Sequence, residues 1–234
     1  IKKFFALAPV GTVKHIKGLI KFCADWLLPL INIWYQILGS GEFIPHSMIT
    51  DMVAKLVCDS GFIQDLCDDV LFLIAGPESN QFNKTRDSVY ISHTPAGTST
   101  QNIMHWAQMV KAGTVARYDW GSAHANQQHY GMSKPPSYDF ANIKTDMYLF
   151  WSDDDWLADP TDIKDYLLTS LDPNYLKNST KLSGYNHLDY IWGLNAPNDV
   201  YHPIIDTITA DLGGSVECPS VKGYNVRGRR GPKL

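Results

Sequence analysis

The amino-acid sequence predicts an α/β fold, with short buried strands and amphipathic helices in a chain of 234 residues. Two continuous apolar runs indicate the strands. Residues 4–10 form the first, and residues 147–151 form the second, which is typical of a strand buried on both faces. Elsewhere, apolar residues recur at helical spacing. Since domains commonly hold about 100–200 residues, the length fits one domain, or one domain with a large insertion.

The segment between the two strands is mostly helical in its apolar periodicity. Ser47 is a possible N-cap, and the helical face that follows comprises Ile49, Met52, Val53, Leu56 and Val57. A second helix is expected after Ser99 or Thr100 and before Gly113. Its apolar stripe would be Ile103, Trp106, Ala107 and Val110. Residues 118–138 are rich in Gly, Pro, Asn, Gln and Ser, which predicts a loop.

The second strand runs into three acids, Asp153 to Asp155, before the next helix. Asp159 is expected to cap that helix, with Pro160 at its first position. Its inward face would be Ile163, Tyr166, Leu167 and Leu171. A last helix is expected from about 197 to 212, with Val200, Ile204, Ile205, Ile208 and Leu212. Because catalytic groups gather at the carboxyl ends of strands in open α/β sheets, the acids stand where function is expected.

Composition and charge exclude some classes of function. The net charge of −4 argues against a nucleic-acid partner, whose binders show a basic stripe. Residues 219–234 are basic and hold no acid, so we expect them to form a flexible appendage. The longest apolar stretch, residues 26–38, is interrupted by Pro29, Asn32 and Gln36, whereas a membrane span needs about 20 residues. We therefore expect no transmembrane segment.

The first residues resemble a signal peptide, because Lys2 and Lys3 precede an apolar run. We interpret that run as a buried strand instead. Since the sequence opens on Ile1, the start of the native product is expected to lie upstream.

Asp155 and His187 are the candidates for catalysis. A carboxylate at a strand end and a histidine on the following loop have the spacing of the acid and base of a serine hydrolase, in which the acid orients the imidazole. The alternatives are a solvated turn at Asp153 to Asp155 and a packed or surface histidine. A magnesium site on the acids is a rival, but no second ligand cluster is evident.

No metal site or cofactor is expected. His124 and His129 do not form the helical HExxH arrangement of a zinc hydrolase, and the four cysteines form no CxxC pair. Two N-glycosylation sequons begin at Asn83 and Asn178, and they matter only in a chain that enters the secretory route.

Several blocks resemble the acid lipase family, which includes gastric and lysosomal acid lipases. They come in family order and cover roughly residues 4–210. The blocks are Ala6-Leu7-Ala8-Pro9-Val10, His93-Thr94-Pro95-Ala96-Gly97-Thr98-Ser99 with Asn102 and His105-Trp106, Tyr118-Asp119-Trp120-Gly121-Ser122, Leu157-Ala158-Asp159-Pro160, Tyr185-Asn186-His187-Leu188-Asp189-Tyr190-Ile191-Trp192, Ala196-Pro197 and Val200-Tyr201.

The resemblance implies the C-terminal portion of an α/β-hydrolase fold with a large helical cap insertion. Residues 1–12 would hold a core strand, 13–140 the cap or lid, 141–212 the C-terminal core with the triad acid and histidine, and 213–234 the basic tail. The implied function is a lipase that cleaves esters of long-chain fatty acids, such as triacylglycerols or cholesteryl esters. Its partners would be the lipid ester and the lipid–water interface.

Carried across residue by residue, the resemblance implies Asp155 as the triad acid and His187 as the base, in agreement with the spacing argument. Asp159 fits better as a helix cap, and Asp189 as a structural neighbour of His187. The resemblance also implies a disulfide between Cys58 and Cys67, which suits a secreted or lysosomal protein. Asn83 lies beside a matching block, Asn178 is a second candidate glycan site, and Cys23 and Cys218 are left unassigned.

The sequence departs from the family pattern in one respect: it contains no GxSxG nucleophile elbow, which in this fold precedes the acid and the histidine. Residues 97–101 come close but lack the last glycine, and Ser99 fits a helix cap better. We expect the serine to lie upstream and the chain alone to be inactive. The alternatives are a catalytically dead lipid-binding homologue and a carboxylesterase for small soluble esters.

Overall fold

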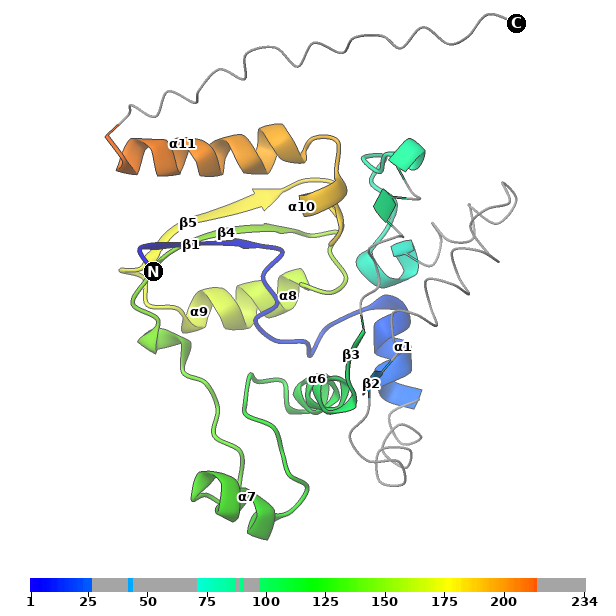
Figure 1. Cartoon of the computed structure of the whole chain (residues 1–234), viewed down its shortest axis with the longest axis vertical. Helices are drawn as coiled ribbons and strands as arrows, with labels where there is room; N and C mark the ends of the chain where they lie inside the picture. Colours follow the sequence, from blue (N-terminus) through cyan, green and yellow to red (C-terminus); the bar gives the residue numbers. More distant parts are fainter. Residues whose placement is uncertain (27–41, 44–70, 87–88, 91–96, 214–234) are drawn as a thin grey trace, which may run out of the picture.

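The computed structural model describes residues 1–26, 42–43, 71–86, 89–90 and 97–213. Its centre is a parallel sheet of three strands in the order β1-β4-β5 (Figure 1). These strands are β1 Lys3–Leu7, β4 Asp146–Ser152 and β5 Leu176–Leu182. The two apolar runs in the sequence therefore pair side by side, with Lys3 opposite Asp146 and Leu7 opposite Phe150. The predicted α/β class is confirmed.

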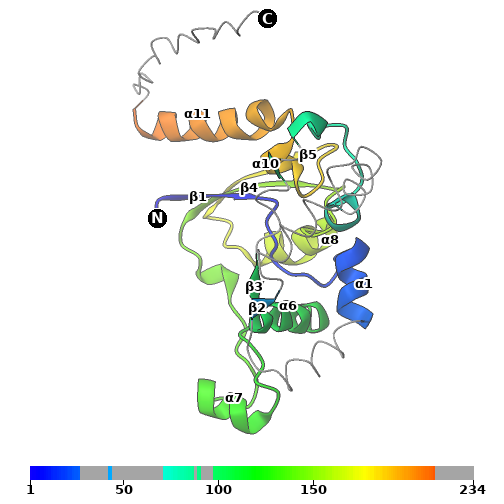
Figure 2. The same cartoon turned by 45° about the vertical axis from the view of Figure 1, so that its right-hand side comes forward.

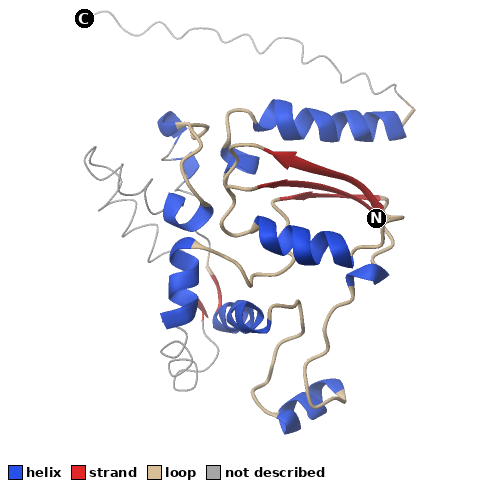
Figure 3. Ribbon diagram, turned by 180° about the vertical axis from the view of Figure 1, so that it is seen from behind, coloured by secondary structure: helices blue, strands red, loops and turns tan. Residues whose placement is uncertain are grey.

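Helices cover both faces of the sheet, as the views from the front and from behind show (Figures 1 and 3). On one face lies α11 His202–Asp211, preceded by a π-helical turn, Pro197–Tyr201. On the other lies a continuous helical segment made of α8 Pro160–Asp162, a π-helical turn Ile163–Leu167, and α9 Leu168–Ser170.

The core follows from the alternation of side chains along the strands. One cluster lies beneath the α8–α9 segment and comprises Ala6, Met147, Leu149, Leu167 and Leu171. The other includes Phe150, Tyr185, Tyr190 and Val200, with Ile204 of α11 packed against it. Strand β4 is central and covered on both faces. Five of its residues are therefore buried, namely Met147 and Leu149 to Ser152.

Strand β5 has no counterpart in the sequence-based prediction. Its residues read LKNSTKL, and most of them are exposed. The strand pairs with β4 through its backbone and contributes little apolar surface, so hydrophobic periodicity gives no signal for it. Strand β1 is also shorter than its apolar run, because Ala8 takes a left-handed backbone conformation with φ 50° and ends the extended chain.

The remaining elements lie below the sheet as it is drawn in Figure 1. They are α1 Gly18–Trp26, β2 Glu42–Phe43, β3 Thr98–Ser99, α6 Thr100–Ala112 and α7 Ala123–Tyr130. Strands β2 and β3 pair antiparallel. Short 3₁₀ or α-helical turns lie at Lys84–Arg86, Phe140–Asn142 and α10 Asp189–Trp192, and residues 71–75 and 89–90 are also helical.

Helix α6 confirms the helix predicted after Ser99, whose side chain accepts a hydrogen bond from the Asn102 N–H at 3.0 Å. The loop predicted over residues 118–138 is wrong in part, because α7 lies within it, at the end of an excursion away from the sheet (Figure 2). The sequence of α7, AHANQQHY, has no apolar stripe, so the helix depends on its Ser122 cap and on polar contacts.

Two predicted apolar stripes are wrong in their details. Trp106 of α6 is 40% exposed, while Met104 and Ala107 are the buried residues of that helix. On the last helix Val200 is buried, but Ile205, Ile208 and Leu212 are exposed. The helix expected after Ser47 lies outside the described residues. Within the part of the chain that is described, no helix is long and apolar enough to cross a membrane.

Candidate active site

Asp155 and His187 lie in contact at the carboxyl edge of the sheet. Asp155 follows β4, and His187 follows β5, so the parallel pairing of these strands brings the two loops together. The Nδ1 atom of His187 lies 3.0 Å from Oδ2 and 3.2 Å from Oδ1 of Asp155. The Asp155 side chain is fully buried, whereas that of His187 is 25% exposed. This geometry fixes one ring nitrogen on the acid and turns the imidazole toward solvent.

The turn around Asp155 determines how its carboxylate is oriented. Oδ1 accepts hydrogen bonds from the backbone N–H groups of Leu157 at 2.9 Å and Ala158 at 2.8 Å. Oδ2 is left for the imidazole. Because both backbone groups are donors, the turn requires an acceptor at Oδ1, and a carboxyl oxygen meets that requirement.

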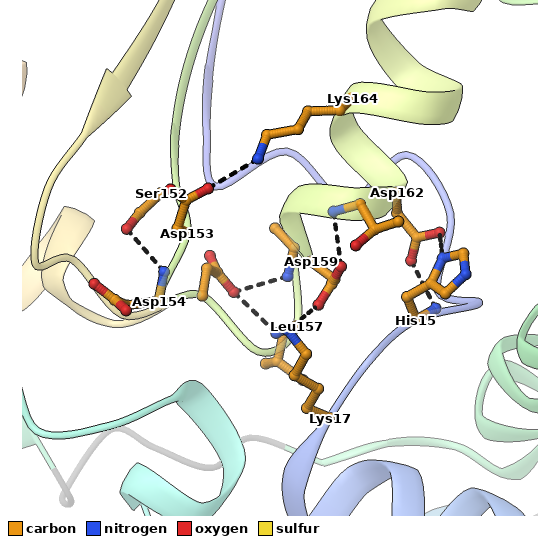
Figure 4. A network of polar contacts seen from close by, with 12 residues as sticks. His15, Lys17, Ser152, Asp153, Asp154, Leu157, Asp159, Asp162 and Lys164 are labelled. Carbon is orange, nitrogen blue, oxygen red and sulfur yellow. Dashed lines mark hydrogen bonds and ion pairs between the residues drawn. The ribbon is translucent and has the colours of Figure 1, made fainter.

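Figure 4 shows that two other acids after β4, Asp153 and Asp159, have partners of their own. Asp153 is exposed and pairs with Lys164 at 3.0 Å and with Lys181, whose hydrogen bond is the main cause of the lowered pKa of Asp153. Asp159 caps α8 by accepting from the Thr161 N–H at 2.8 Å, and it pairs with Lys17 at 2.7 Å. These acids hold neighbouring segments together, and Asp155 is the acid that contacts the β5 loop.

Asp159 is buried, and burial alone would raise its pKa. The hydrogen bonds from Lys17 and from Thr161 outweigh that effect, so the pKa of Asp159 is lowered and the side chain is ionised. The assignment of Asp159 as the cap of the helix after β4 is confirmed by this geometry.

A second aspartate–histidine pair escaped the sequence-based search. Nδ1 of His15 lies 2.8 Å from Oδ1 of the buried Asp162, and the backbone N–H of His15 donates to Oδ2 at 2.9 Å. Both oxygens of Asp162 are thus bound to one residue, which anchors the chain that follows β1 to α8. The His15 side chain is 42% exposed. Nothing in the spacing of these residues singles them out, because the contact joins a loop to a helix that is distant in sequence.

The loop that carries His187 is held by Asn186 and Asp189, both buried. Oδ2 of Asp189 accepts from the Asn186 N–H at 2.7 Å, and Oδ1 of Asn186 accepts from the Leu188 N–H at 2.9 Å. Burial raises the pKa of Asp189; hydrogen bonds from Ser79 and Asn186 oppose that rise, and the nearby charge of Asp155 adds to it. Asp189 is a structural neighbour of His187, as expected from the sequence.

The segment formed by residues 75–81 runs between the two loops, and we call it the strap. The carbonyl of Ala75 accepts from both the Trp156 and the His187 N–H groups, each at 3.1 Å. This contact could not be predicted from the sequence, since backbone groups mediate it.

The other predicted sites are the two glycan acceptors and the cysteine pair. Asn83 accepts from the Thr85 N–H and hydroxyl, and Asn178 is exposed on β5. Cys58 and Cys67 lie outside the described residues. Among the residues that the structure describes, no group of three or more His, Cys, Asp or Glu side chains is arranged to hold a metal ion.

Comparisons with known proteins identify lipases as relatives. Lipase lipl-1 of Caenorhabditis elegans is 55% identical over 213 residues, which are 91% of this chain and 52% of the relative. Human gastric triacylglycerol lipase is 41% identical over 214 residues, which are 90% and 52% of the two chains. A putative lysosomal acid lipase/cholesteryl ester hydrolase of Crotalus adamanteus is 37% identical over 208 residues, which are 88% and 50%.

No protein-family model matches the sequence. The chain spans about half the length of the curated relatives that it matches. The alignments cover about nine-tenths of this chain. Lipase homologues imply an α/β-hydrolase fold, with which the parallel sheet and its covering helices agree. By this identity, the chain is a homologue of lipases that include gastric triacylglycerol lipase and a putative lysosomal acid lipase.

Proposed function

We propose that this chain supplies the acid and the base of a serine-hydrolase triad that cleaves carboxylic esters of long-chain fatty acids. The observation that carries the proposal is the fully buried Asp155, hydrogen-bonded at 3.0 Å to Nδ1 of a partly exposed His187 at the carboxyl edge of the sheet. In such a triad the acid fixes the tautomer and stabilises the imidazolium.

The roles of the two residues follow from this geometry. With Nδ1–H donated to Asp155, the opposite nitrogen, Nε2, is the unprotonated acceptor. Nε2 of His187 takes the proton of a serine hydroxyl as the serine oxygen attacks the ester carbonyl, and it delivers that proton to the departing alcohol. Water then attacks the acyl-enzyme, again giving its proton to Nε2, and the fatty acid leaves as the proton returns to serine.

The serine belongs, in this proposal, to a GxSxG elbow outside these 234 residues, because the sequence contains none. The substrate class follows from the relatives: one is named for triacylglycerol and another for cholesteryl ester. Accordingly, we propose a lipid ester at a lipid–water interface as the substrate, and a secreted or lysosomal site of action.

The same proposal gives the chain its organisation. Residues 13–140 form a helical cap inserted between the core strand of residues 1–12 and the C-terminal core of residues 141–212, and residues 213–234 form a basic tail. The presence of described helices α1, α6 and α7 between β1 and β4 supports such an insertion. We further propose a disulfide between Cys58 and Cys67 and glycans on Asn83 and Asn178, which peptide mass spectrometry of the secreted protein tests.

The test uses the product of the native gene, whose transcript is first sequenced for an elbow serine before Ile1. Ester hydrolysis is measured for wild type, His187→Ala and His15→Ala. The two histidines are matched, since each contacts a buried aspartate through Nδ1. We expect His187→Ala to lose activity by several orders of magnitude and His15→Ala to retain it; the reverse result would overturn the assignment.

Two further outcomes separate the alternatives. A native product that hydrolyses only short, soluble esters is a carboxylesterase. A native product that lacks the elbow serine and binds lipid without turnover is a non-catalytic homologue. Hydrolysis rates across a series of acyl chain lengths distinguish these outcomes from lipase activity.

A further inference from the structure

We propose that the strap, residues 75–81, is a positioning segment that sets the distance between Asp155 and His187. The inference rests on the proposed function, because it assigns to cap-side backbone a part in the catalytic geometry. Residues 71–75 are helical and lead directly into the strap. The strap lies far from both loops in sequence, yet it touches each of them next to the acid–base pair.

The carbonyl of Ala75 is the central contact. It accepts one hydrogen bond from the N–H of Trp156, the residue after Asp155, and one from the N–H of His187 itself. Both distances are 3.1 Å. Ala75 is fully buried, so neither N–H can exchange this acceptor for water without cost. A single oxygen therefore links the backbones of the acid loop and the base loop.

Gly76 brings the strap into closest contact with the acid loop. Its φ is +128°, a conformation that side-chain-bearing residues rarely adopt. A Cβ built there would lie 2.2 Å from the carbonyl oxygen of Asp154 and 3.2 Å from Cβ of Asn186. These atoms belong to the residues just before Asp155 and His187. A side chain at position 76 would therefore have to displace the backbone of the acid loop and press on the histidine loop.

The rest of the strap binds the histidine loop. The Pro77 carbonyl accepts from Nδ2 of Asn186 at 3.2 Å, and Ser79 hydrogen-bonds to Asp189. At the far end, Nε2 of Gln81 donates to the Gly184 carbonyl at 2.8 Å. Contacts therefore extend along the strap on the base side, while Ala75 and Gly76 also hold the acid side. The strap spans both loops, whereas Asp189 and Asn186 stabilise one loop from within.

The test compares Gly76→Ala with Gly131→Ala. Gly131 also has a positive φ, +69°, but a Cβ there meets nothing within 4 Å, and the residue lies at the end of α7. It therefore gives an alanine at a positive φ that has no contact with the loops. The native gene product supplies kcat and KM on a short soluble ester. The His187 ring is followed by ¹⁵N NMR in the 234-residue chain, a readout that needs no serine.

We expect Gly76→Ala to lower kcat by roughly 100-fold, the order of loss for a displacement of about 1 Å, with KM within about twofold. Its His187 Nδ1–H signal should shift or disappear, while Gly131→Ala keeps both kcat and the signal. A folded Gly76→Ala protein that matches Gly131→Ala in kcat and in the ring signal overturns the proposal. If wild type hydrolyses no ester, the proposed function fails, and the NMR comparison still decides whether the strap positions the pair.

If Gly76→Ala does not fold, Ser79→Ala is the second variant, because it removes the contact with Asp189 and the hydrogen bond from the Gln81 N–H but leaves Ala75 and Gly76 unchanged. We expect a smaller loss of kcat, about tenfold, together with a shifted His187 signal, and recovery in Ser79→Thr, which keeps the hydroxyl. Full kcat and an unchanged ring signal in a folded Ser79→Ala protein overturn the proposal.

Discussion

Replacing Asp155 by Asn tests the orientation of the acid directly. Asn is nearly isosteric, so it keeps the packing of the buried site. Its amide has one acceptor and one donor group, while the turn offers two donors, the Leu157 and Ala158 N–H groups, to Oδ1. The carbonyl oxygen must therefore stay on those groups. The NH₂ group then occupies the position of Oδ2, 3.0 Å from Nδ1 of His187.

The consequence is a change of tautomer. Facing a donor, Nδ1 of His187 becomes the acceptor, and the ring proton moves to Nε2, which can then no longer take the proton of serine. A triad with this substitution loses about 10⁴-fold in kcat, and at about 1.4 kcal/mol per decade this corresponds to about 5.5 kcal/mol of transition-state stabilisation. Little loss of stability is expected, since the backbone hydrogen bonds remain.

Two measurements check this reasoning. The ¹⁵N shifts of the His187 ring in the 234-residue chain report the tautomer, and kcat of the native gene product reports the rate. Asp153→Asn is the matched control, because Asp153 is an exposed neighbour that pairs with Lys164 and Lys181. An Asp155→Asn protein that keeps its Nδ1–H tautomer, or a control that loses as much activity, would refute the argument.

Three further expectations concern stability, each measured by urea unfolding. The pKa of Asp189 is raised in the folded state, so the stability that this group contributes is complete below its unfolded pKa of about 3.9 and is lost as pH rises through its folded pKa. Over that pH rise, the free energy of unfolding of Asp189→Asn should increase relative to that of wild type. The pKa of Asp159 is lowered in the folded state, so the stability that it contributes is lost as the pH falls through that pKa. In Lys17→Met this loss should begin at a higher pH. An unchanged dependence of unfolding free energy on acidic pH would contradict this expectation. Ser99→Ala should cost about 1 kcal/mol by removing the α6 cap, and a change near zero would show that the cap is dispensable.

Much of the fold could be predicted from the sequence, because the pattern of apolar residues indicates most of its buried strands and helices. The strands β1 and β4 are continuous apolar runs, and α6 has a serine cap at its start and a glycine at its end. Strand β5 could not be predicted, since its sequence, LKNSTKL, lacks an apolar pattern and the strand is held by backbone hydrogen bonds to β4. Helix α7 was missed for a related reason: its stability comes from polar contacts such as that of Asn126 with Asp119.

The candidate site was likewise predictable only in part. Asp155 and His187 could be selected because Asp155 follows an apolar run, because a histidine follows it at the spacing of a serine-hydrolase acid and base, and because their sequence blocks resemble a family. The pairing of His15 with Asp162 and the two hydrogen bonds to the Ala75 carbonyl could not be selected. These contacts join segments that are distant in sequence and use groups, such as backbone amides, that every residue possesses.

The pairing of β1 with β4 also constrains how the chain is made. The partners Lys3 and Asp146 are separated by roughly 140 residues, which a ribosome adds in roughly 7–30 s at about 5–20 residues per second. Throughout that interval the edge of β1 that β4 covers has no partner among the described strands. This side of the sheet can therefore close only after the residues between β1 and β4 have left the ribosome, so β4 completes the pairing late in synthesis.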